Sequence, residues 1–224
     1  MPHWKNIPIH VIDFEGSTHT GVVEYGIVTL LNGEIISAVT RLCAPSAPVP
    51  RLDTQCHGLR DADLNGTDPM AADWELFAGL RRSGLLAAHH APTENGLLKA
   101  IWPYPGAMPD HARADGGAVN DWGPWIDTYR ITATWHPRLA DRKLASLMEW
   151  FRLEKRLGQL SQCYCPANRH RYHCALYDAL ASAVLLRHLC AQPDKLDVTL
   201  EKLVLASMGS ERHADRMQCE LEFF

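Results

Sequence analysis

Asn32 and Gly33 separate two long runs of apolar residues, and this pair restricts the folds open to the chain more than any other feature. The flanking runs are GVVEYGIVTLL at residues 21–31 and EIISAVTRLC at residues 34–43. Asn-Gly between two such runs is the strongest short-range signal for a β-hairpin, because both residues tolerate the positive φ angles of the tight turn. A third run, IPIHVIDF at residues 7–14, is rich in β-branched residues and ends before Gly16. We therefore expect three strands, in an antiparallel meander, at the start of the chain.

Beyond residue 43, helices and short strands are expected to alternate. Residues 44–69 hold four prolines and few apolar runs, which indicates an irregular segment with at most a short helix near residues 59–64. Residues 103–124 hold four glycines and four prolines, which indicates a surface insertion. The remaining patterns predict strands at residues 85–88 and 125–128 and helices at residues 71–82, 93–102, 141–156, 173–191 and 196–207.

Strands that come first and then alternate with helices predict an α/β fold, in which helices flank a mixed β-sheet. A length of 224 residues suits one such domain with a small appendage. We place the domain at residues 1–207, including the insertion at 103–124, and a C-terminal tail at residues 208–224.

The composition excludes several classes of protein. Hydrophobic residues at 46% and charged residues at 21% are typical of globular domains and exclude the disordered, collagen-like and coiled-coil classes. The seven cysteines are an odd number, and no secretory leader or membrane-length apolar run is present, so we expect a cytoplasmic protein with reduced thiols and no membrane partner. The formal net charge of −4, taken alone, argues against a nucleic-acid partner.

Asp13 and Glu15 are the first candidate functional residues. Residues two apart on a strand point to the same side, so D-F-E directs two carboxylates into one space while Phe14 points into the core. Gly16 lets a large group approach the backbone. Two adjacent carboxylates repel each other and favour a bound cation, although two solvated charges at a strand end would give the same pattern.

His173 and Asp178, in HCALYDALASAVLL, are the second candidate pair. Five residues correspond to about 140° around a helix, so both side chains serve one site only if His173 lies at the helix entrance or before it, with Asp178 in the second turn. A histidine in front of a helix is more often a cap or a hydrogen-bonding core residue. In AAHHAPTENGLL, at residues 87–98, a short strand similarly brings His89, His90 and Glu94 to the start of a helix.

Together these segments resemble the DEDD superfamily of 3′ to 5′ exonucleases, and more narrowly its His-variant branch, which includes the proofreading subunit of bacterial replicative polymerases. The resemblance spans roughly residues 7–191 and implies a ribonuclease-H-like fold. VIDFE at residues 11–15 is similar to the first family motif, and HCALYDA at residues 173–179 is similar to the last. Asp127-Thr128 resembles an acidic-Thr pair in the strand before the third helix. His57-Gly58-Leu59 resembles the H-G-[IL] turn, which in relatives lies against the terminal nucleotide.

The second family motif, H-N-A-x-F-D, is altered in this chain. His90 stands in place of the Asn, Thr93 in place of the Phe and Glu94 in place of the Asp. The negative charge is kept, and glutamate reaches one methylene further, so a metal contact through Glu94, direct or through water, is still within reach.

The resemblance implies a site for two divalent cations, and oxygen ligands select Mg²⁺ or Mn²⁺. The implied metal ligands are Asp13, Glu15 and Asp178 for the first cation, with Asp13 bridging and Glu94 supporting the second. His173 is the implied general base, because the ordinary histidine pKa near 6.5 suits proton removal at neutral pH. The implied contacts of the terminal nucleotide are Phe14, Gly16, His57, Gly58, Leu59 and His90.

The implied activity is release of nucleoside 5′-monophosphates from a nucleic-acid 3′ end, with DNA favoured over RNA and a role in repair or proofreading. Two bound divalent cations would offset the formal charge of −4 where the scissile phosphate lies. Two alternatives stay open. One is the same chemistry on RNA or short oligoribonucleotides. The other is a non-catalytic nucleic-acid or clamp-binding adaptor of the same fold, for which Glu94 is the only support in the sequence.

The C-terminal tail carries a separate pattern. Gln218, Leu221 and Phe223, in QCELEF, resemble the Q-x-x-L-x-F pattern with which bacterial replication and repair proteins bind the sliding clamp. The alternative is that these apolar side chains fold back onto the domain.

Two further groups of residues are weaker candidates. Cys163, Cys165, His170, His173 and Cys174 would suggest zinc, but C-x-C without a second matched pair is poor spacing for a zinc site. Arg142, Arg169 and Arg171 are candidate contacts for substrate phosphates, although exposed basic residues are common.

Overall fold

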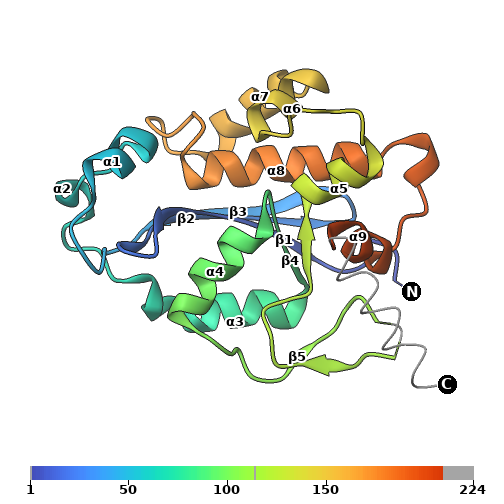
Figure 1. The fold of residues 1–224 in the computed structure, drawn as a ribbon, viewed down its shortest axis with the longest axis horizontal. Helices are drawn as coiled ribbons and strands as arrows, with labels where there is room; N and C mark the ends of the chain where they lie inside the picture. Colours follow the sequence, from blue (N-terminus) through green and yellow to red (C-terminus); the bar gives the residue numbers. More distant parts are fainter. Residues whose placement is uncertain (1, 114, 209–224) are drawn as a thin grey trace.

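A five-stranded mixed sheet forms the centre of the molecule (Figure 1). The structure is a computed structural model that describes residues 2–113 and 115–208. The strands, in the spatial order β3-β2-β1-β4-β7, are β3 (Glu34–Leu42), β2 (Gly21–Leu31), β1 (Ile9–Ser17), β4 (Leu85–Ala88) and β7 (Trp125–Asp127). β2 pairs antiparallel with both β1 and β3, whereas β4 pairs parallel with β1 and β7. The predicted meander is confirmed, and Asn32 and Gly33 have φ angles of 54° and 75° in its second turn.

Helices cover both faces of this sheet. They are α1 (Arg51–His57), α2 (Asp61–Leu64), α3 (Trp74–Ser83), α4 (Ala91–Ile101), α5 (Thr128–Trp135), α6 (Leu144–Trp150), α7 (Glu154–Tyr164), α8 (Ala175–Cys190) and α9 (Leu200–Ser207). Figure 1 shows α8 along one face of the sheet, with α6 and α7 outside it, and α3 and α4 on the opposite face. The mixed sheet between helical layers is the ribonuclease-H-like architecture that the sequence predicts.

α8 supplies the centre of the core, because it is apolar around most of its circumference and most of its residues are buried. Its first turn lies directly against β2 at Gly26, where a Cβ would overlap the backbone of Ala175. A second cluster on the other face of the sheet contains Phe14 and Phe77, whose ring centroids are 5.8 Å apart. The sheet is therefore anchored on both faces close to the end of β1.

The prediction of one helix over residues 141–156 is wrong. α6 ends at Trp150, and α7 begins at Glu154 and continues through Gly158 to Tyr164. Arg152, between the two helices, has a φ of 57°, which interrupts the right-handed helical backbone. The chain therefore turns at Arg152.

α5 is absent from the sequence prediction. It begins directly after β7, because the Asp127 carboxylate accepts hydrogen bonds from the backbone N–H groups of Tyr129 (3.0 Å) and Arg130 (3.3 Å). Such a side-chain cap satisfies donors that the first helical turn leaves free. α1 is also absent from the prediction, which placed only a short helix in this region, close to the observed α2.

Part of the expected surface insertion at residues 103–124 belongs to the core. Met108 and Trp122 are buried, and a small antiparallel pair, β5 (Met108–Pro109) and β6 (Ala118–Val119), lies within the segment. The buried Arg81 of α3 donates hydrogen bonds to the backbone carbonyls of Pro109, Trp122 and Gly123. These contacts attach the segment to α3.

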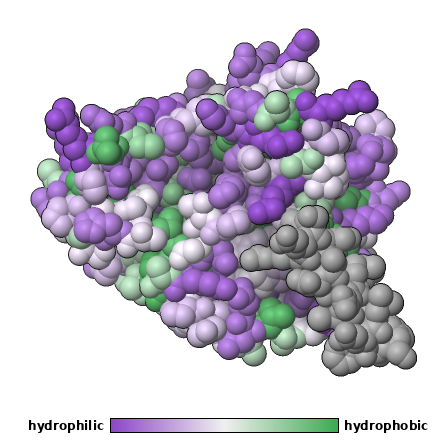
Figure 2. Space-filling model, viewed as in Figure 1, coloured by the Kyte–Doolittle hydropathy of each residue, from purple (hydrophilic) through white to green (hydrophobic). Residues whose placement is uncertain are grey.

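The face of the molecule seen in Figure 2 is mainly hydrophilic, with hydrophobic residues scattered among polar ones. Among the residues that the structure describes, no helix combines the length and the apolar character needed to cross a membrane.

Candidate active site

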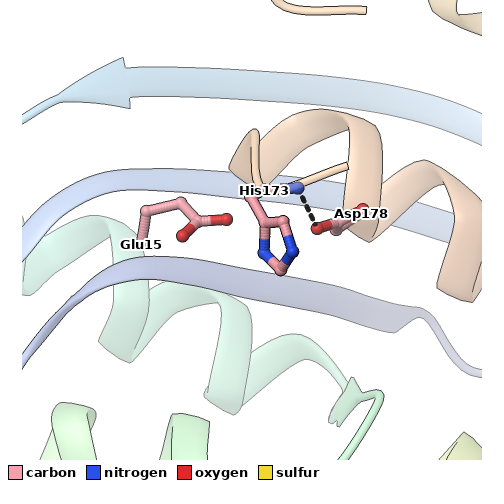
Figure 3. Close-up of side chains that lie close together, drawn as sticks. All are labelled: Glu15, His173 and Asp178. Atoms are coloured by element: carbon pink, nitrogen blue, oxygen red, sulfur yellow. Dashed lines mark hydrogen bonds between the residues drawn. The ribbon is translucent and has the colours of Figure 1, made fainter. Parts of the chain in front are cut away.

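Glu15, His173 and Asp178 come together between the end of β1 and the start of α8 (Figure 3). One ligand atom from each of the three side chains lies within 4.8 Å of the others. Glu15 and Asp178 are buried, whereas His173 is exposed. The imidazole therefore stands at the solvent side of two largely desolvated carboxylates.

The entrance to α8 explains why residues five apart share this site. His173 precedes the helix with a φ of 61°, and Cys174 is the extended residue before Ala175. The Asp178 carboxylate accepts a hydrogen bond of 2.8 Å from the backbone N–H of His173 (Figure 3). His173 thus meets the condition that it lie before the helix. The sequence predicts Asp178 in the second helical turn, but the structure places it in the first.

Glu94 reaches the same region from α4 on the opposite face of the sheet. Its side chain is buried, and its Oε2 accepts a hydrogen bond of 3.0 Å from the backbone N–H of Phe14. Phe14 stands between Asp13 and Glu15 on β1, so the Glu94 carboxylate lies beside the D-x-E segment. The longer side chain at this position therefore makes a contact with β1.

Burial and mutual repulsion raise the pKa values of all four carboxyl groups. Burial is the largest cause in each case. The pKa of Glu15 rises from 4.5 to about 8, with Asp178 and Glu24 adding repulsion and Arg169 and Arg171 partly opposing it. The pKa of Glu94 also rises to about 8, that of Asp178 to about 7, and that of Asp13 well above its ordinary value.

The second oxygen of Asp178 supplies a test of whether these residues suit a metal ion. Its Oδ1 is buried and has no hydrogen-bond partner in the described part of the chain. A buried carboxylate oxygen without a donor costs free energy unless a cation or water pairs with it. Together with the clustered oxygen ligands and their raised pKa values, this atom fits a hard divalent cation.

Glu24 is a residue of this region that the sequence prediction missed. It lies opposite Glu15 in the antiparallel pairing of β1 with β2, and it is buried. Its carboxylate forms an ion pair with the buried Arg169 and accepts a hydrogen bond of 3.0 Å from the backbone N–H of Ala175. The signal in the sequence was an acidic residue within an otherwise apolar strand, two residues before Gly26.

The H-G-L turn lies at the end of α1, and its side chains are tied into the protein. His57 is buried, and its Nδ1 accepts a hydrogen bond of 3.1 Å from the backbone N–H of Leu59, which is also buried. Arg169 donates a hydrogen bond of 2.6 Å to the backbone carbonyl of His57. Gly58 caps α1 with a φ of 81°, a left-handed conformation that favours glycine.

The other predicted substrate contacts surround the end of β1 and the start of α4. Phe14 is buried against Phe77, as expected, and Gly16, with a φ of 130°, lies against the carbonyl oxygen of Gly21. His90 is exposed, precedes α4 with a φ of 74°, and forms a hydrogen bond of 2.8 Å with Thr93. His90 and Thr93, two of the altered motif positions, thus contact each other.

Asp127 does not belong to the group of Glu15, His173 and Asp178, and its carboxylate instead accepts hydrogen bonds from the backbone. Besides capping α5, it accepts hydrogen bonds from the backbone N–H groups of His90 (3.1 Å) and Ala91 (3.2 Å). One carboxylate therefore holds the starts of both α4 and α5.

The cysteine and histidine residues considered for zinc do not form a ligand cluster in the described part of the chain, where the group of Glu15, His173 and Asp178 is found instead. The predicted clamp-binding residues Gln218, Leu221 and Phe223 lie outside the described residues.

Comparison with solved structures places the fold among exonucleases. A complex of exonuclease X with 5′-overhanging duplex DNA matches with a TM-score of 0.64 and 18% identity, over 89% of this chain and 99% of that one. A 3′-exonuclease that recognises the histone mRNA stem-loop matches with a TM-score of 0.62 and 11% identity, over 87% and 66% of the two chains. E. coli exonuclease I bound to an oligonucleotide matches with a TM-score of 0.59 and 11% identity, over 85% and 42%. No family model and no curated protein matches the sequence.

At these identities the likeness concerns the fold. The chain has the ribonuclease-H-like fold that 3′ to 5′ exonucleases share, and its buried carboxylate cluster lies where β1 meets the start of α8.

Proposed function

We propose that this protein is a metal-dependent 3′ to 5′ exonuclease of the His-variant DEDD type, which releases nucleoside 5′-monophosphates. The observation that carries the proposal is the convergence of Glu15, His173 and Asp178 within 4.8 Å in an exonuclease fold. A non-catalytic adaptor has no need for buried carboxylates that repel one another, because such charges destabilise the fold unless a cation pairs with them.

Asp13, Glu15 and Asp178 would hold one divalent cation, Mg²⁺ or Mn²⁺, and Glu94 would support a second one beside Asp13. When bound, two such ions supply a polarised water and neutralise charge on the attacking and leaving oxygens of a phosphodiester. One matched structure is a zinc-bound form of exonuclease I in complex with single-stranded DNA. The oxygen-rich ligand set of this chain favours the harder cations.

His173 would act as the general base. Its ring is exposed beside two carboxylates, and its backbone is fixed by the hydrogen bond to Asp178, so a proton taken from water at this opening can pass to solvent. The H-G-L turn and the backbone around Phe14 and Gly16 would hold the terminal nucleotide.

We favour DNA as the substrate, in repair or proofreading. Exonuclease X is matched in a complex with DNA, whereas another matched enzyme recognises a histone mRNA stem-loop. Discrimination at the 2′-OH depends on the shape of the pocket around the terminal sugar.

The test is hydrolysis of 5′-labelled single-stranded DNA, overhanging duplex DNA and RNA with Mg²⁺, Mn²⁺ or EDTA. We expect metal-dependent shortening from the 3′ end in mononucleotide steps, faster on DNA than on RNA. Asp13→Asn and His173→Ala should each lower the rate by about 10²–10⁴-fold. Glu149→Gln, which removes an exposed carboxylate on α6 outside the cluster, is the matched control and should keep the wild-type rate. If neither DNA nor RNA is shortened in the presence of metal, the result favours a non-catalytic adaptor of the same fold.

Binding of the bacterial sliding clamp through Gln218, Leu221 and Phe223 stays a separate proposal that depends on the tail alone. Deleting residues 218–224 should abolish binding to the clamp while the hydrolysis of short single strands is kept.

A further inference from the structure

A groove of about 490 Å³ lies beside the H-G-L turn. Gly58 and Leu59 line it together with the segment that leads into α8, which contributes Asn168, Arg169 and Arg171. The end of β3 contributes Arg41. The groove therefore borders the turn that the proposed function assigns to the terminal nucleotide.

Two of the three arginines in this groove are already neutralised. Arg169 is buried and paired with Glu24, and it also donates to the carbonyl of His57. Arg41 is paired with Asp73 and donates to the carbonyls of Asp68 and Pro69. Both side chains serve to build the walls of the groove.

Arg171 differs from these two. It is exposed, and its one hydrogen bond in the described structure is a long contact of 3.4 Å to the backbone carbonyl of Cys56. Its guanidinium lies directly against Gly58, where a Cβ would collide with Nη2. Arg171 also stands two residues before His173 in the segment that leads into α8, so the groove adjoins the carboxylate cluster.

An arginine in this position is suited to a phosphate. Its planar fork of N–H donors matches two oxygens of one phosphate, and such charge-assisted pairs are stronger than neutral hydrogen bonds. The chain carries a formal charge of −4, and the carboxylates of Glu24 and Asp63 also line the groove, so an incoming polyanion needs a local cation. The exposed amide of Asn168 adds hydrogen-bond donors to the same groove.

We propose that this groove binds the backbone of the nucleic-acid strand whose 3′ end lies at the carboxylate cluster, with Arg171 contacting a phosphate on the 5′ side of the terminal nucleotide. The class of ligand rests on the proposed function, whereas the groove and the weakly hydrogen-bonded guanidinium of Arg171 are features of this chain. The contact is to the backbone and therefore does not depend on base sequence.

The experiment measures binding of 5′-labelled single-stranded dT12 and dA12 by fluorescence anisotropy, in the Asp13→Asn background, at salt concentrations between about 50 and 300 mM. Arg171→Ala should weaken binding about fivefold at low salt, equally for both sequences, and should reduce the slope of log K against log salt by about 0.7. Arg171→Lys keeps the charge and loses the fork, so it should retain most of the slope with a smaller loss of affinity. Arg138→Ala, which removes an exposed arginine between α5 and α6, is the matched control and should leave affinity and slope at the values of the background.

The outcomes separate this proposal from the proposed function. If wild-type protein hydrolyses nucleic acid but Arg171→Ala binds like Arg138→Ala, the proposed binding of the strand in this groove is wrong and the enzyme assignment is kept. If the protein binds strands through Arg171 but never shortens them, the groove is supported and the enzyme assignment fails. Circular dichroism of Arg171→Ala checks that the fold is intact, and Arg171→Glu, which reverses the charge, should weaken binding further than the alanine variant does.

Discussion

The backbone N–H of His173 donates a hydrogen bond of 2.8 Å to the carboxylate of Asp178, five residues later. This bond closes a turn in front of α8 in which His173 has a left-handed backbone, with a φ of 61°. It fixes one oxygen of Asp178 and leaves Oδ1 buried without a hydrogen-bond partner among the residues that the structure describes. One carboxylate thus both orients the histidine segment and offers a bare oxygen to a cation.

The variant Asp178→Asn separates these two roles. The amide oxygen can still accept the His173 hydrogen bond, so the fold should be kept, while the charge that pairs with a cation is lost. We expect metal-dependent hydrolysis to fall by about 10²–10⁴-fold, because metal-assisted charge stabilisation contributes several kcal/mol. Single-turnover hydrolysis at saturating Mg²⁺ measures the effect. A rate within tenfold of wild type would remove Asp178 from the site.

Glu94 contacts β1 from another helix, and its replacements distinguish a metal role from a structural one. Glu94→Ala leaves the Phe14 N–H buried without an acceptor and should cost about 1–3 kcal/mol of unfolding free energy. Glu94→Gln keeps an acceptor and loses only the charge. Both should lower activity about 10–100-fold, as expected for a residue that supports metal ligands. Rates and urea unfolding measure the two effects, and full activity in Glu94→Ala would show that Glu94 is not a site residue.

The carboxylate cluster should make the metal-free protein less stable as pH rises. Glu15 and Glu94 have pKa values of about 8 in the folded protein and Asp178 of about 7, so near neutral pH the folded state binds more protons than the unfolded state. The contribution of these carboxyl groups to the unfolding free energy is therefore fully present below their ordinary pKa values and is lost as pH increases through the folded values. Urea unfolding in EDTA between pH 6.5 and 8 measures this slope.

Mg²⁺ should flatten that pH dependence, because a cation favours the ionised carboxylates. The range is kept above pH 6.5 because His10, buried between Thr29 and Ser83, has a pKa lowered to about 4. Its contribution to stability is lost as pH falls from the ordinary histidine value towards 4, the opposite direction. Metal-free stability that rises from pH 6.5 to 8 would contradict the raised pKa values of these buried carboxyl groups.

Gly26 lets α8 approach β2, and a methyl group there should push the site apart. A Cβ on Gly26 would overlap the backbone of Ala175, two residues after His173, so Gly26→Ala should cost about 1–3 kcal/mol or more and should lower activity. The control is Gly79→Ala in the middle of α3, where a Cβ meets no atom within 4 Å. That variant should gain about 0.5–1 kcal/mol of stability. Thermal unfolding compares the two, and equal melting temperatures would contradict the close approach.

Local patterns were sufficient for much of the fold. The Asn32-Gly33 turn, the three strands around it and the apolar α8 follow from side-chain periodicity and turn preference, which act between near neighbours. The sequence prediction missed the break at Arg152 and the cap at Asp127. Neither an arginine with a left-handed backbone nor a carboxylate that caps two helices changes the periodic pattern of apolar residues from which helices are predicted.

For the site, the sequence by itself determined that Asp13 and Glu15 share one side of a strand and that His173 and Asp178 stand at the start of a buried helix. Only the tertiary structure decided that these segments meet, that Glu94 reaches β1 from α4, and that Glu24 joins Arg169 to the first turn of α8. The physical reason is distance along the chain. The Glu24–Arg169 contact spans 145 residues, and Glu94 is 80 residues from Phe14, so these contacts exist only once the sheet and its helices have packed. The same packing commits Arg169 to the interior and leaves Arg171 at the surface, a difference that two arginines separated by one residue do not reveal in the sequence.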